Sequence, residues 1–313
     1  MQFFKSTNMD FIGNRHKFFV VSILFFVITI VAFIYRQGPN YGIDFTGGIM
    51  MQVSFENKLD DLQDVRKAIE EAQVTSFELQ TSENLVVIRA KKSLQSQEEF
   101  EKSISQSIQN RFPDNPMKIE RIEYVGPSVG QYLSKQALYA FFFAFLGMIV
   151  YVAFRFKSSL WGIVSVLGII HDVIISFGFV ILVNKEVNIT VVAALLTVAG
   201  YSINDTIVLF DRIKENLRFG SKETFANIIN KSINEVLVRT IVTSLTVFIV
   251  ASSLFFFGGE VIHTFAYIMV IGTVLGVYST IFLCTPLVYE WEVRRSNRLK
   301  MAIKQGAVNS KKK

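Results

Sequence analysis

Residues 137–154 read ALYAFFFAFLGMIVYVAF, an apolar run without a single charged side chain. At a rise of 1.5 Å per residue, a helix of this length can cross the ~30 Å hydrocarbon core of a membrane. Similar runs recur along the chain, and the other predicted spans are residues 18–35, 160–183, 187–210, 239–257 and 262–289. The pattern predicts an α-helical polytopic membrane protein with six transmembrane helices.

The composition supports a membrane protein and excludes several other classes. Apolar residues make up 51% of the chain, aromatic residues 13%, and 30 residues are Phe. The formal net charge of +6 does not indicate nucleic-acid binding, because the basic residues flank the apolar runs and form a terminal tail. We expect membrane lipid to surround the chain instead. The single cysteine, Cys284, lies in an apolar run and excludes an intrachain disulfide or a thiolate metal cluster.

Lys and Arg residues predict the orientation of the spans. They concentrate in residues 1–17, at Arg155 and Lys157, in residues 212–239 and in the tail 291–313. The alternate connections carry few basic residues. By the positive-inside rule, both termini are cytoplasmic and residues 36–136 are periplasmic. The first span is too long for a typical signal-peptide core and is not followed by an A-x-A-like cleavage site, so we expect an uncleaved anchor.

The predicted periplasmic domain, residues 36–136, alternates strand and helix patterns. Strands are expected at 51–55, 77–80, 85–90 and 118–125, and apolar residues at helical spacing predict two helices. The strand-helix-strand-strand-helix-strand order is that of an α+β ferredoxin-like domain. The domain has no His and no Cys, which removes most metal-assisted and nucleophilic chemistry. We therefore expect a binding or lever role rather than an enzyme, with no catalytic residues.

The remaining region, residues 137–290, holds the second to sixth spans and one further predicted element. Apolar residues recur at helical spacing in residues 221–237, with Ser221 as the expected N-cap. This pattern predicts an amphipathic helix on the cytoplasmic face between the fourth and fifth spans.

Three charged residues fall within or at the ends of predicted spans: Asp172 in the third, Asp205 in the fourth and Arg239 at the start of the fifth. An ionisable side chain at membrane depth costs about 2.5–3.5 kcal/mol on insertion scales, so each is a candidate functional residue. Asp205 and Arg239 lie about 9 Å and 14 Å to the same side of their span midpoints, which allows them to pair if the helices are neighbours.

Polar and small residues accompany these charges. The third span has the stripe Ser165, Gly168, Asp172 and Ser176, and the fifth span has the stripe Arg239, Thr243, Thr246 and Ser253. Such stripes predict interior, closely packed helix faces, as does the Gly272-x-x-x-Gly276 pattern of the sixth span. A fixed structural ion pair is an alternative to a proton relay for Asp205 and Arg239. His171 is more typical of a packed, hydrogen-bonded side chain than of a proton carrier.

Three segments resemble a known family. Tyr41-Gly42-Ile43-Asp44-Phe45-Thr46-Gly47-Gly48 resembles the segment that opens the periplasmic domain of SecD and SecF proteins. Val125-Gly126-Pro127-Ser128-Val129-Gly130 resembles their second signature, and residues 200–216, which include Asn204 and Asp205, resemble the fourth-span motif of SecF-type members. The motif residues singled out are Asp44, Gly47, Gly48, Gly126, Pro127, Gly130 and Asn204. Simple turns at the membrane surface would also explain the glycines.

The resemblance implies a fold, a function and partners. Members of this family are related to resistance-nodulation-division transporters, in which two six-span units pack together, so a SecD partner is implied for the second unit. The pair acts in the bacterial plasma membrane beside the SecYEG channel, with YajC and YidC as further candidate partners. It uses the proton-motive force to promote late steps of the translocation of polypeptides driven by SecA.

The resemblance also implies roles for individual residues. It assigns Asp205 and Arg239 to a proton relay and gives Asp172 a less defined role. We expect no cofactor and no metal, and the sequence leaves open whether protons or sodium ions are the coupling ion. Two alternatives remain at this point: a proton-driven exporter of small molecules or lipids, and an assembly subunit without proton coupling.

Overall fold

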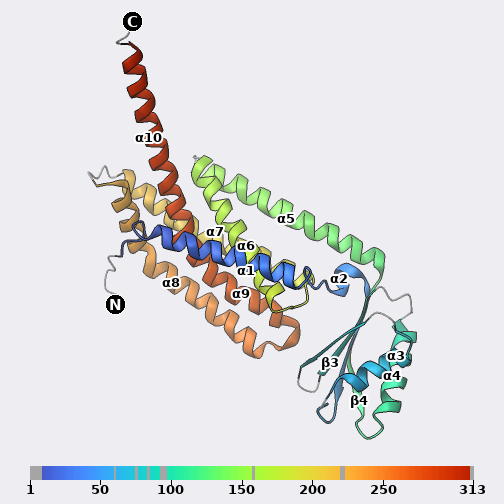
Figure 1. The fold of residues 1–313 in the computed structure, drawn as a ribbon. Helices are drawn as coiled ribbons and strands as arrows, with labels where there is room; N and C mark the ends of the chain where they lie inside the picture. Colours follow the sequence, from blue (N-terminus) through green and yellow to red (C-terminus); the bar gives the residue numbers. More distant parts are fainter. Residues whose placement is uncertain are drawn as a thin grey trace. The chain divides into compact units, whose positions relative to one another are not determined.

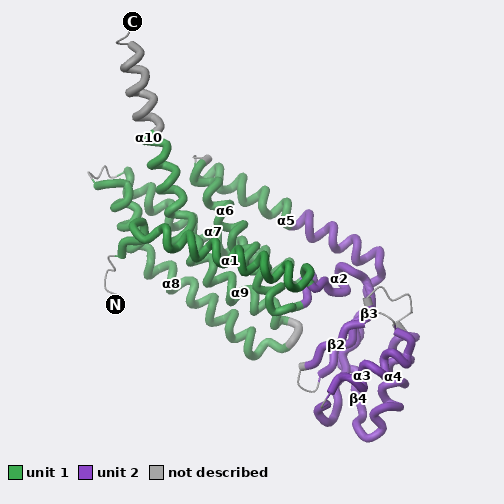
Figure 2. Tube along the Cα trace, viewed as in Figure 1, with its two compact units in different colours: residues 1–39, 141–185, 190–313 green, residues 40–140, 186–189 purple. Residues whose placement is uncertain are grey.

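The computed structural model describes residues 9–59, 61–74, 77–82, 85–91, 97–156, 159–218 and 223–310. The chain divides into two compact units (Figure 2). The helical unit comprises Met1–Pro39, Phe141–Lys185 and Thr190–Lys313. The α/β unit comprises Asn40–Ala140 together with Glu186–Ile189. The short segment Glu186–Ile189 thus belongs to a unit whose other residues are far from it in the sequence.

The α/β unit contains a four-stranded antiparallel sheet with the strand order β2-β3-β1-β4 (Figure 1). A short helix, α2 (Ile43–Thr46), precedes the first strand. The ferredoxin-like order predicted from the sequence is confirmed. Its elements are β1 (Gly48–Phe55), α3 (Gln63–Glu71), β2 (Phe77–Ser82), β3 (Leu85–Lys91), α4 (Gln97–Arg111) and β4 (Met117–Val125).

One face of the sheet carries the core of this unit. Successive side chains of a strand point to opposite faces, so Ile49, Met51 and Val53 of β1 are buried together. The strand register places Ile49 opposite Ala90 and Val53 opposite Val86 of β3. Both helices cover this face, through Val65, Ala68 and Ile69 of α3 and Phe100, Ile104 and Ile108 of α4.

Six helices of the described chain are long and apolar enough to cross a membrane, as predicted. The outer ones, α1, α5 and α8, bury 11%, 11% and 17% of their most apolar windows, whereas α6, α7 and the last helix bury 56%, 56% and 61%. The latter three therefore form the centre of the helical unit. The bounds are α1 (Arg15–Tyr35), α5 (Pro127–Phe156), α6 (Ser159–Leu182), α7 (Ile189–Arg218), α8 (Phe225–Phe257), α9 (Gly259–Ser279), a π-helical turn (Thr280–Cys284) and α10 (Thr285–Ser310).

Glycines let α9 approach α7 closely. A Cβ built on Gly272 would collide with the side chain of Val198, and one on Gly276 would lie 3.4 Å from the Cα of Ser202. The close-packing interpretation of the Gly272-x-x-x-Gly276 pattern is therefore confirmed.

The structure corrects the predicted amphipathic helix. Instead of a separate surface helix at 221–237, one continuous helix, α8, runs from Phe225 to Phe257. Ser221 lies outside the described residues, and Thr224 caps the helix by accepting a hydrogen bond from the backbone N–H of Asn227 at 3.3 Å. The sequence between the two predicted segments contains no Gly or Pro to end the helix. Its apolar residues Ile228, Ile229 and Ile233 are buried within the protein rather than on a membrane surface.

Two other boundaries also differ from the prediction. Helix α5 begins at Pro127, where the fixed φ of proline suits the first turn of a helix, rather than near residue 137. The predicted basic tail, residues 291–313, is mostly helical, because α10 continues to Ser310. In both cases polar residues extend a helix beyond its apolar run. Hydropathy alone therefore places the start of α5 too late and the end of the last helix too early.

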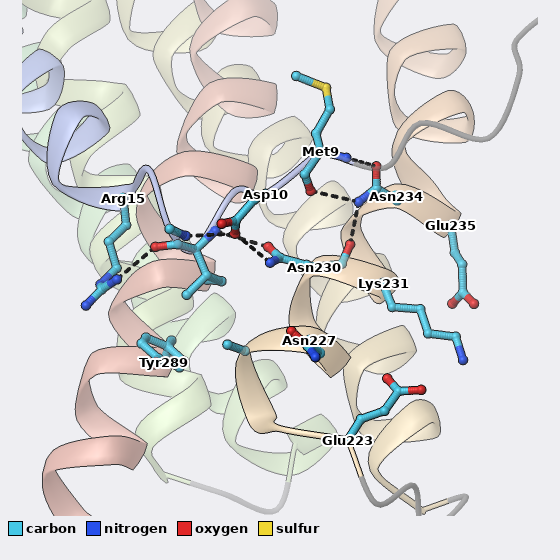
Figure 3. A pocket seen from close by; sticks show the side chains of 13 residues that line it. Met9, Asp10, Arg15, Glu223, Asn227, Asn230, Lys231, Asn234, Glu235 and Tyr289 are labelled. Carbon is cyan, nitrogen blue, oxygen red and sulfur yellow. Dashed lines mark hydrogen bonds between the residues drawn. The ribbon is translucent and has the colours of Figure 1, made fainter.

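A cavity of about 750 Å³ lies between the N-terminal segment and the first turns of α8 (Figure 3). Asn234 forms two hydrogen bonds with the backbone of Met9, accepting from its N–H at 3.2 Å and donating to its carbonyl at 3.1 Å. The Oδ1 atom of Asn230 accepts from the backbone N–H groups of Phe11 and Ile12, both at 3.0 Å. Amide side chains of α8 thus hold the segment before α1.

Replacing Phe100 of α4 by Ala should lower the free energy of unfolding of the α/β unit by about 3–5 kcal/mol, because the ring is fully buried. Proteolysis of the full chain in detergent, across a urea series, measures this loss. Tyr124→Ala on β4 is the matched control, since Tyr124 is 48% exposed, and its effect should stay within about 0.5 kcal/mol. Equal protease resistance of the Phe100→Ala variant and the unmodified chain would contradict the assigned core.

Asp10 should make the anchoring of the N-terminal segment sensitive to acid. Its carboxylate accepts hydrogen bonds from the backbone N–H of Gly13 at 2.9 Å and from Nδ2 of Asn230 at 2.7 Å, and these bonds hold the pKa of Asp10 below its usual range. A lowered folded-state pKa gives stabilisation that is present above the unfolded value of about 3.9 and is lost as the pH falls through the folded value. We therefore expect the segment to be held at pH 7 and released in acid.

A spin label on Met9→Cys would report this release, since the native Cys284 is buried. Its mobility should rise as the pH falls below about 4. In an Asp10→Asn background the label should already be mobile at pH 7. Equal immobility of the label in both backgrounds at pH 7 would show that Asp10 does not hold the segment.

Candidate functional site

Polar side chains of the central helices collect in the interior of the helical unit. A polar group in an apolar environment is costly unless it finds a hydrogen-bond partner, so these side chains are expected to meet one another. The interior position predicted for the stripe of α6 is confirmed. The buried polar residues are Ser165, His171, Asp172 and Ser176 of α6, Ser202, Asp205 and Thr206 of α7, and Thr273, Ser279, Thr280 and Thr285 of the last helix.

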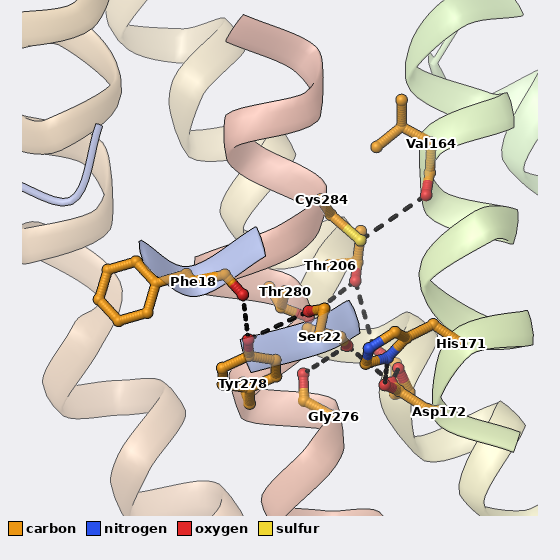
Figure 4. A network of polar contacts seen from close by, with 12 residues as sticks. Phe18, Ser22, Val164, His171, Asp172, Thr206, Gly276, Tyr278, Thr280 and Cys284 are labelled. Atoms are coloured by element: carbon orange, nitrogen blue, oxygen red, sulfur yellow. Dashed lines mark hydrogen bonds and ion pairs between the residues drawn. The ribbon is translucent and has the colours of Figure 1, made fainter. Parts of the chain in front are cut away.

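Asp172 joins the three central helices (Figure 4). Its side chain is fully buried. The Oδ2 atom accepts hydrogen bonds from Oγ of Ser202 on α7 at 2.5 Å and from Oγ of Ser279 on α9 at 2.7 Å. The Oδ1 atom lies 2.8 Å from Nδ1 of the adjacent His171. One carboxylate therefore gathers donors from α6, α7 and α9.

A second pair of hydroxyl groups extends this network along the last helix. The hydroxyl groups of Thr206 on α7 and Thr280 are 2.8 Å apart. Thr280 opens the π-helical turn, and its carbonyl accepts a hydrogen bond from the hydroxyl of Thr285 at 2.7 Å. π-Helical turns within α-helices are frequent at functional sites, because the extra residue frees backbone groups and reorients side chains.

His171 connects the network to α1 by ring packing. Its ring stacks on that of Tyr278, with centroids 6.3 Å apart, and meets the edge of Phe26 at 5.4 Å. The Tyr278 hydroxyl donates to the backbone carbonyl of Phe18 at 2.7 Å and lies 3.0 Å from the hydroxyl of Ser22. Within the described part of the chain, Nε2 of His171 is buried and has no hydrogen-bond partner.

Asp205 lies one helical turn beyond Ser202 on α7 and is only 3% exposed. Its Oδ2 atom accepts a hydrogen bond from Oγ of Ser244 on α8 at 3.2 Å. Arg239 of α8 is the partner that the sequence predicts for Asp205. Among the described residues, however, no ion pair or hydrogen bond joins the two side chains. Asp205 thus contacts α8 as expected, but its hydrogen-bond partner there is Ser244 rather than Arg239.

The predicted polar stripe of α8 is exposed on the surface of this chain. Its members Arg239, Thr243, Thr246 and Ser253 are all exposed, whereas the buried polar residues of this helix stretch are Thr240 and Ser244. The prediction of an interior face was wrong for the chain taken alone. The reason is that periodicity shows which residues share a face but does not show which neighbour that face meets.

Sequence reasoning missed three hydroxyl donors to the two acids: Ser202, Ser244 and Ser279. Ser202 could have been predicted from the sequence, since it lies three residues before Asp205 in the fourth-span motif. Ser244 and Ser279 carried no distinguishing signal, because isolated serines are common in membrane helices.

The glycine motifs pack against each other within the α/β unit. Gly47 has a φ of +69°, which favours glycine, and a Cβ there would lie 2.9 Å from the Cα of Pro127. A Cβ on Gly130 would lie 2.9 Å from the backbone N of Gly47. Gly48 follows with a φ of 138°, and Gly126 directly precedes α5. The two motifs therefore form one close backbone contact in addition to any role as turns.

The two other motif residues lie in different environments. Asp44 lies in α2, and its Oδ2 atom accepts a hydrogen bond from the backbone N–H of Ile189 at 2.9 Å. Asn204 precedes Asp205 on α7, but its side chain is on the exposed face of the helix. In the part of the chain that the structure describes, no group of three or more His, Cys, Asp or Glu side chains is placed to hold a metal ion.

The chemistry available at the centre is that of carboxylic acids among hydroxyl groups. A carboxyl group can take up and release a proton, and neighbouring hydroxyl groups can both donate and accept hydrogen bonds as it does so. Carboxylate and hydroxyl oxygens can also surround a small cation. The arrangement therefore suits ion-linked switching of helix contacts.

Comparison with family models identifies the chain along most of its length. The model described as "Protein export membrane protein SecD/SecF, C-terminal" matches residues 103–294. The model described as "SecD/SecF GG Motif" matches residues 32–58, which include Asp44, Gly47 and Gly48.

Individual proteins agree with the models. The chain is 73% identical over 311 residues to the protein translocase subunit SecF of Endomicrobium trichonymphae, covering 99% of this chain and 100% of that protein. It is 43% identical to the SecF subunit of Calditerrivibrio nitroreducens, covering 90% of this chain and 94% of the relative. The crystal structure of SecDF from Thermus thermophilus, described as a translocon-associated membrane protein, superposes with a TM-score of 0.82 at 30% identity.

That alignment covers 91% of this chain but 39% of the SecDF chain, so this chain spans about two fifths of that protein. The remaining part of SecDF has no counterpart in this alignment. The chain therefore belongs to the SecD/SecF family of protein-export membrane proteins, among its SecF subunits.

Proposed function

We propose that this multi-pass membrane subunit couples the proton-motive force to late steps of polypeptide translocation. The observation that carries the proposal is the burial of two acids, Asp172 and Asp205, on neighbouring central helices, each bonded to hydroxyl groups of another helix. Acids at membrane depth are costly and are typical of ion pathways. The SecF family membership favours export of polypeptides over export of small molecules or lipids.

In this mechanism Asp205 alternates between two states. When ionised, it attracts the Arg239 guanidinium; when protonated, it keeps its bond with Ser244 and releases the arginine. Moving one elementary charge through 100 mV makes about 2.3 kcal/mol available, which shifts a two-state equilibrium about fifty-fold. Asp172 serves as the second acid of the relay, because its partners Ser202 and Ser279 link the same helix, α7, to α9.

The orientation follows from the basic residues. The N-terminal segment, the residues around Arg155 and those after Arg212 are rich in Lys and Arg, which favours a cytoplasmic position for them. The α/β unit then lies in the periplasm, where it can contact the emerging polypeptide. The bacterial plasma membrane is the site of action.

An exposed polar face favours a membrane partner. Arg239, Thr243 and Thr246 of α8 and Asn204 of α7 are exposed on this chain although they belong to membrane-spanning helices. Contact of these residues with lipid tails would be unfavourable, whereas a second protein unit can supply hydrogen-bond partners. We assign SecD to this face, and SecYEG, with YajC and YidC, to the larger assembly that receives polypeptides driven by SecA.

Asp205→Asn should leave assembly with SecD intact and remove the gradient-stimulated part of export, because an amide cannot ionise. Export of a reporter polypeptide into proteoliposomes, with and without an imposed proton gradient, measures the effect. Asp211→Asn is the matched control: Asp211 lies on the same helix but pairs with Arg155 and is partly exposed.

The control should retain full stimulation by the gradient. Undiminished stimulation in the Asp205→Asn variant would contradict the relay and would favour an assembly subunit without proton coupling. Replacing the proton gradient by a sodium gradient in the same assay distinguishes the two coupling ions.

A further inference from the structure

The connection between α6 and α7 is built into the α/β unit. Its residues Glu186–Ile189 group with that unit rather than with the helical one. Val187 pairs with Tyr41 in a parallel bridge: its N–H donates to the carbonyl of Asn40 at 2.7 Å, and its carbonyl accepts from the N–H of Gly42 at 2.9 Å. The connection therefore behaves as a short added strand beside the segment that leads into the sheet.

A buried ion pair fixes the start of this connection. The Nη2 atom of Arg89 on β3 lies 2.5 Å from Oε2 of Glu186, and the two side chains are 7% and 13% exposed. Gly42 permits the close approach, since a Cβ at that position would collide with the Glu186 carboxylate. Removing one member of such a pair leaves a buried charge without compensation, which is strongly unfavourable.

The end of the connection is held by Asp44. Ile189 is the first residue of α7, and its N–H donates to Oδ2 of Asp44 at 2.9 Å. The first N–H groups of a helix have no partner within the helix, and a carboxylate there satisfies one of them and interacts favourably with the helix dipole. The cap comes from a residue 145 positions earlier in the sequence.

We propose that Glu186–Ile189 is a clamp by which the α/β unit holds the first turn of α7, with Arg89 and Asp44 as its positioning residues. The clamp stays closed throughout the working cycle. Helix α7 also carries Ser202 and Asp205, the latter 16 residues or about 24 Å along the helix from Ile189. Asp205 and the clamp therefore lie on one continuous helix, through which we expect a change of state at Asp205 to reach the α/β unit. This transmission rests on the proposed function, whereas the clamp itself does not.

Hydrogen exchange of the full chain in detergent tests the clamp without any export assay. Asp44→Ala should raise the exchange rate at Ile189 and in the first turn of α7 about five-fold, the effect of replacing a typical helix cap by Ala. Glu120→Ala is the matched control, because Glu120 belongs to the same unit but contacts Ser54 and Lys118 on the sheet surface. It should leave exchange in α7 unchanged. Unchanged exchange in the Asp44→Ala variant would overturn the clamp.

Charge reversal separates a specific pair from general damage to the fold. Arg89→Glu and Glu186→Arg should each raise exchange in residues 186–189, and the double variant should restore protection at least partly. Equal loss in the double and single variants, with the rest of the sheet still protected, would overturn the role of the pair.

Export assays test whether the clamp transmits a change at Asp205 to the α/β unit. In the Asp44→Ala variant, gradient-stimulated export should fall while basal export stays unchanged. Unchanged stimulation despite faster exchange would show that the clamp has only a structural role. A double variant, Tyr41→Cys with Val187→Cys, can form a disulfide, because the two positions are spaced like residues of paired strands. The oxidised chain should keep the export activity of the reduced chain. Loss on oxidation would overturn a permanently closed clamp.

The outcomes also separate the clamp from proton coupling. If Asp205→Asn retains full stimulation while Asp44→Ala still alters exchange in α7, the proton relay fails and the clamp stands. If Asp205→Asn loses stimulation by the gradient while Asp44→Ala leaves exchange in α7 unchanged, the relay stands and the clamp fails.

Discussion

The helical unit depends on the hydrogen bonds that the Asp172 carboxylate receives from Ser202 and Ser279. An acid in a membrane-spanning helix cannot turn to water, so the fold must supply donors from neighbouring helices. Here the donors come from α7 and α9, which requires both helices to pack against α6 at the level of Asp172. The glycines of α9 make this possible by letting its backbone approach Ser202 of α7.

The same helix, α7, carries the second acid and is held at its first residue by the α/β unit. The N–H of its exposed first residue bonds to Asp44, and its buried face is engaged by Asp172 in the middle and by Ser244 next to Asp205. Its other face, with Asn204, is exposed on this chain. A helix with this distribution of contacts is suited to pass a change at an acid on to both neighbouring helices.

The family motifs acquire a physical meaning from these contacts. The glycines Gly47 and Gly130 allow two backbone segments to touch where chain enters and leaves the α/β unit. Asp44, in the same motif as Gly47, reaches a third segment, at the start of α7. Turn formation alone would need the glycines but would not need the aspartate.

The sequence by itself determined the six apolar helices, the ferredoxin-like strand order and the candidate acids Asp172 and Asp205, because hydropathy and periodicity are local properties of the chain. It also predicted the interior stripe of α6 and the close approach at Gly272 and Gly276. Only the tertiary structure decided that α8 is one helix from Phe225, that Asp205 bonds to Ser244, and that the stripe containing Arg239 is exposed. Those outcomes depend on how helices pack, which no local sequence pattern encodes. The same holds for Asp172, whose two hydroxyl donors lie 30 and 107 residues away from it in the sequence.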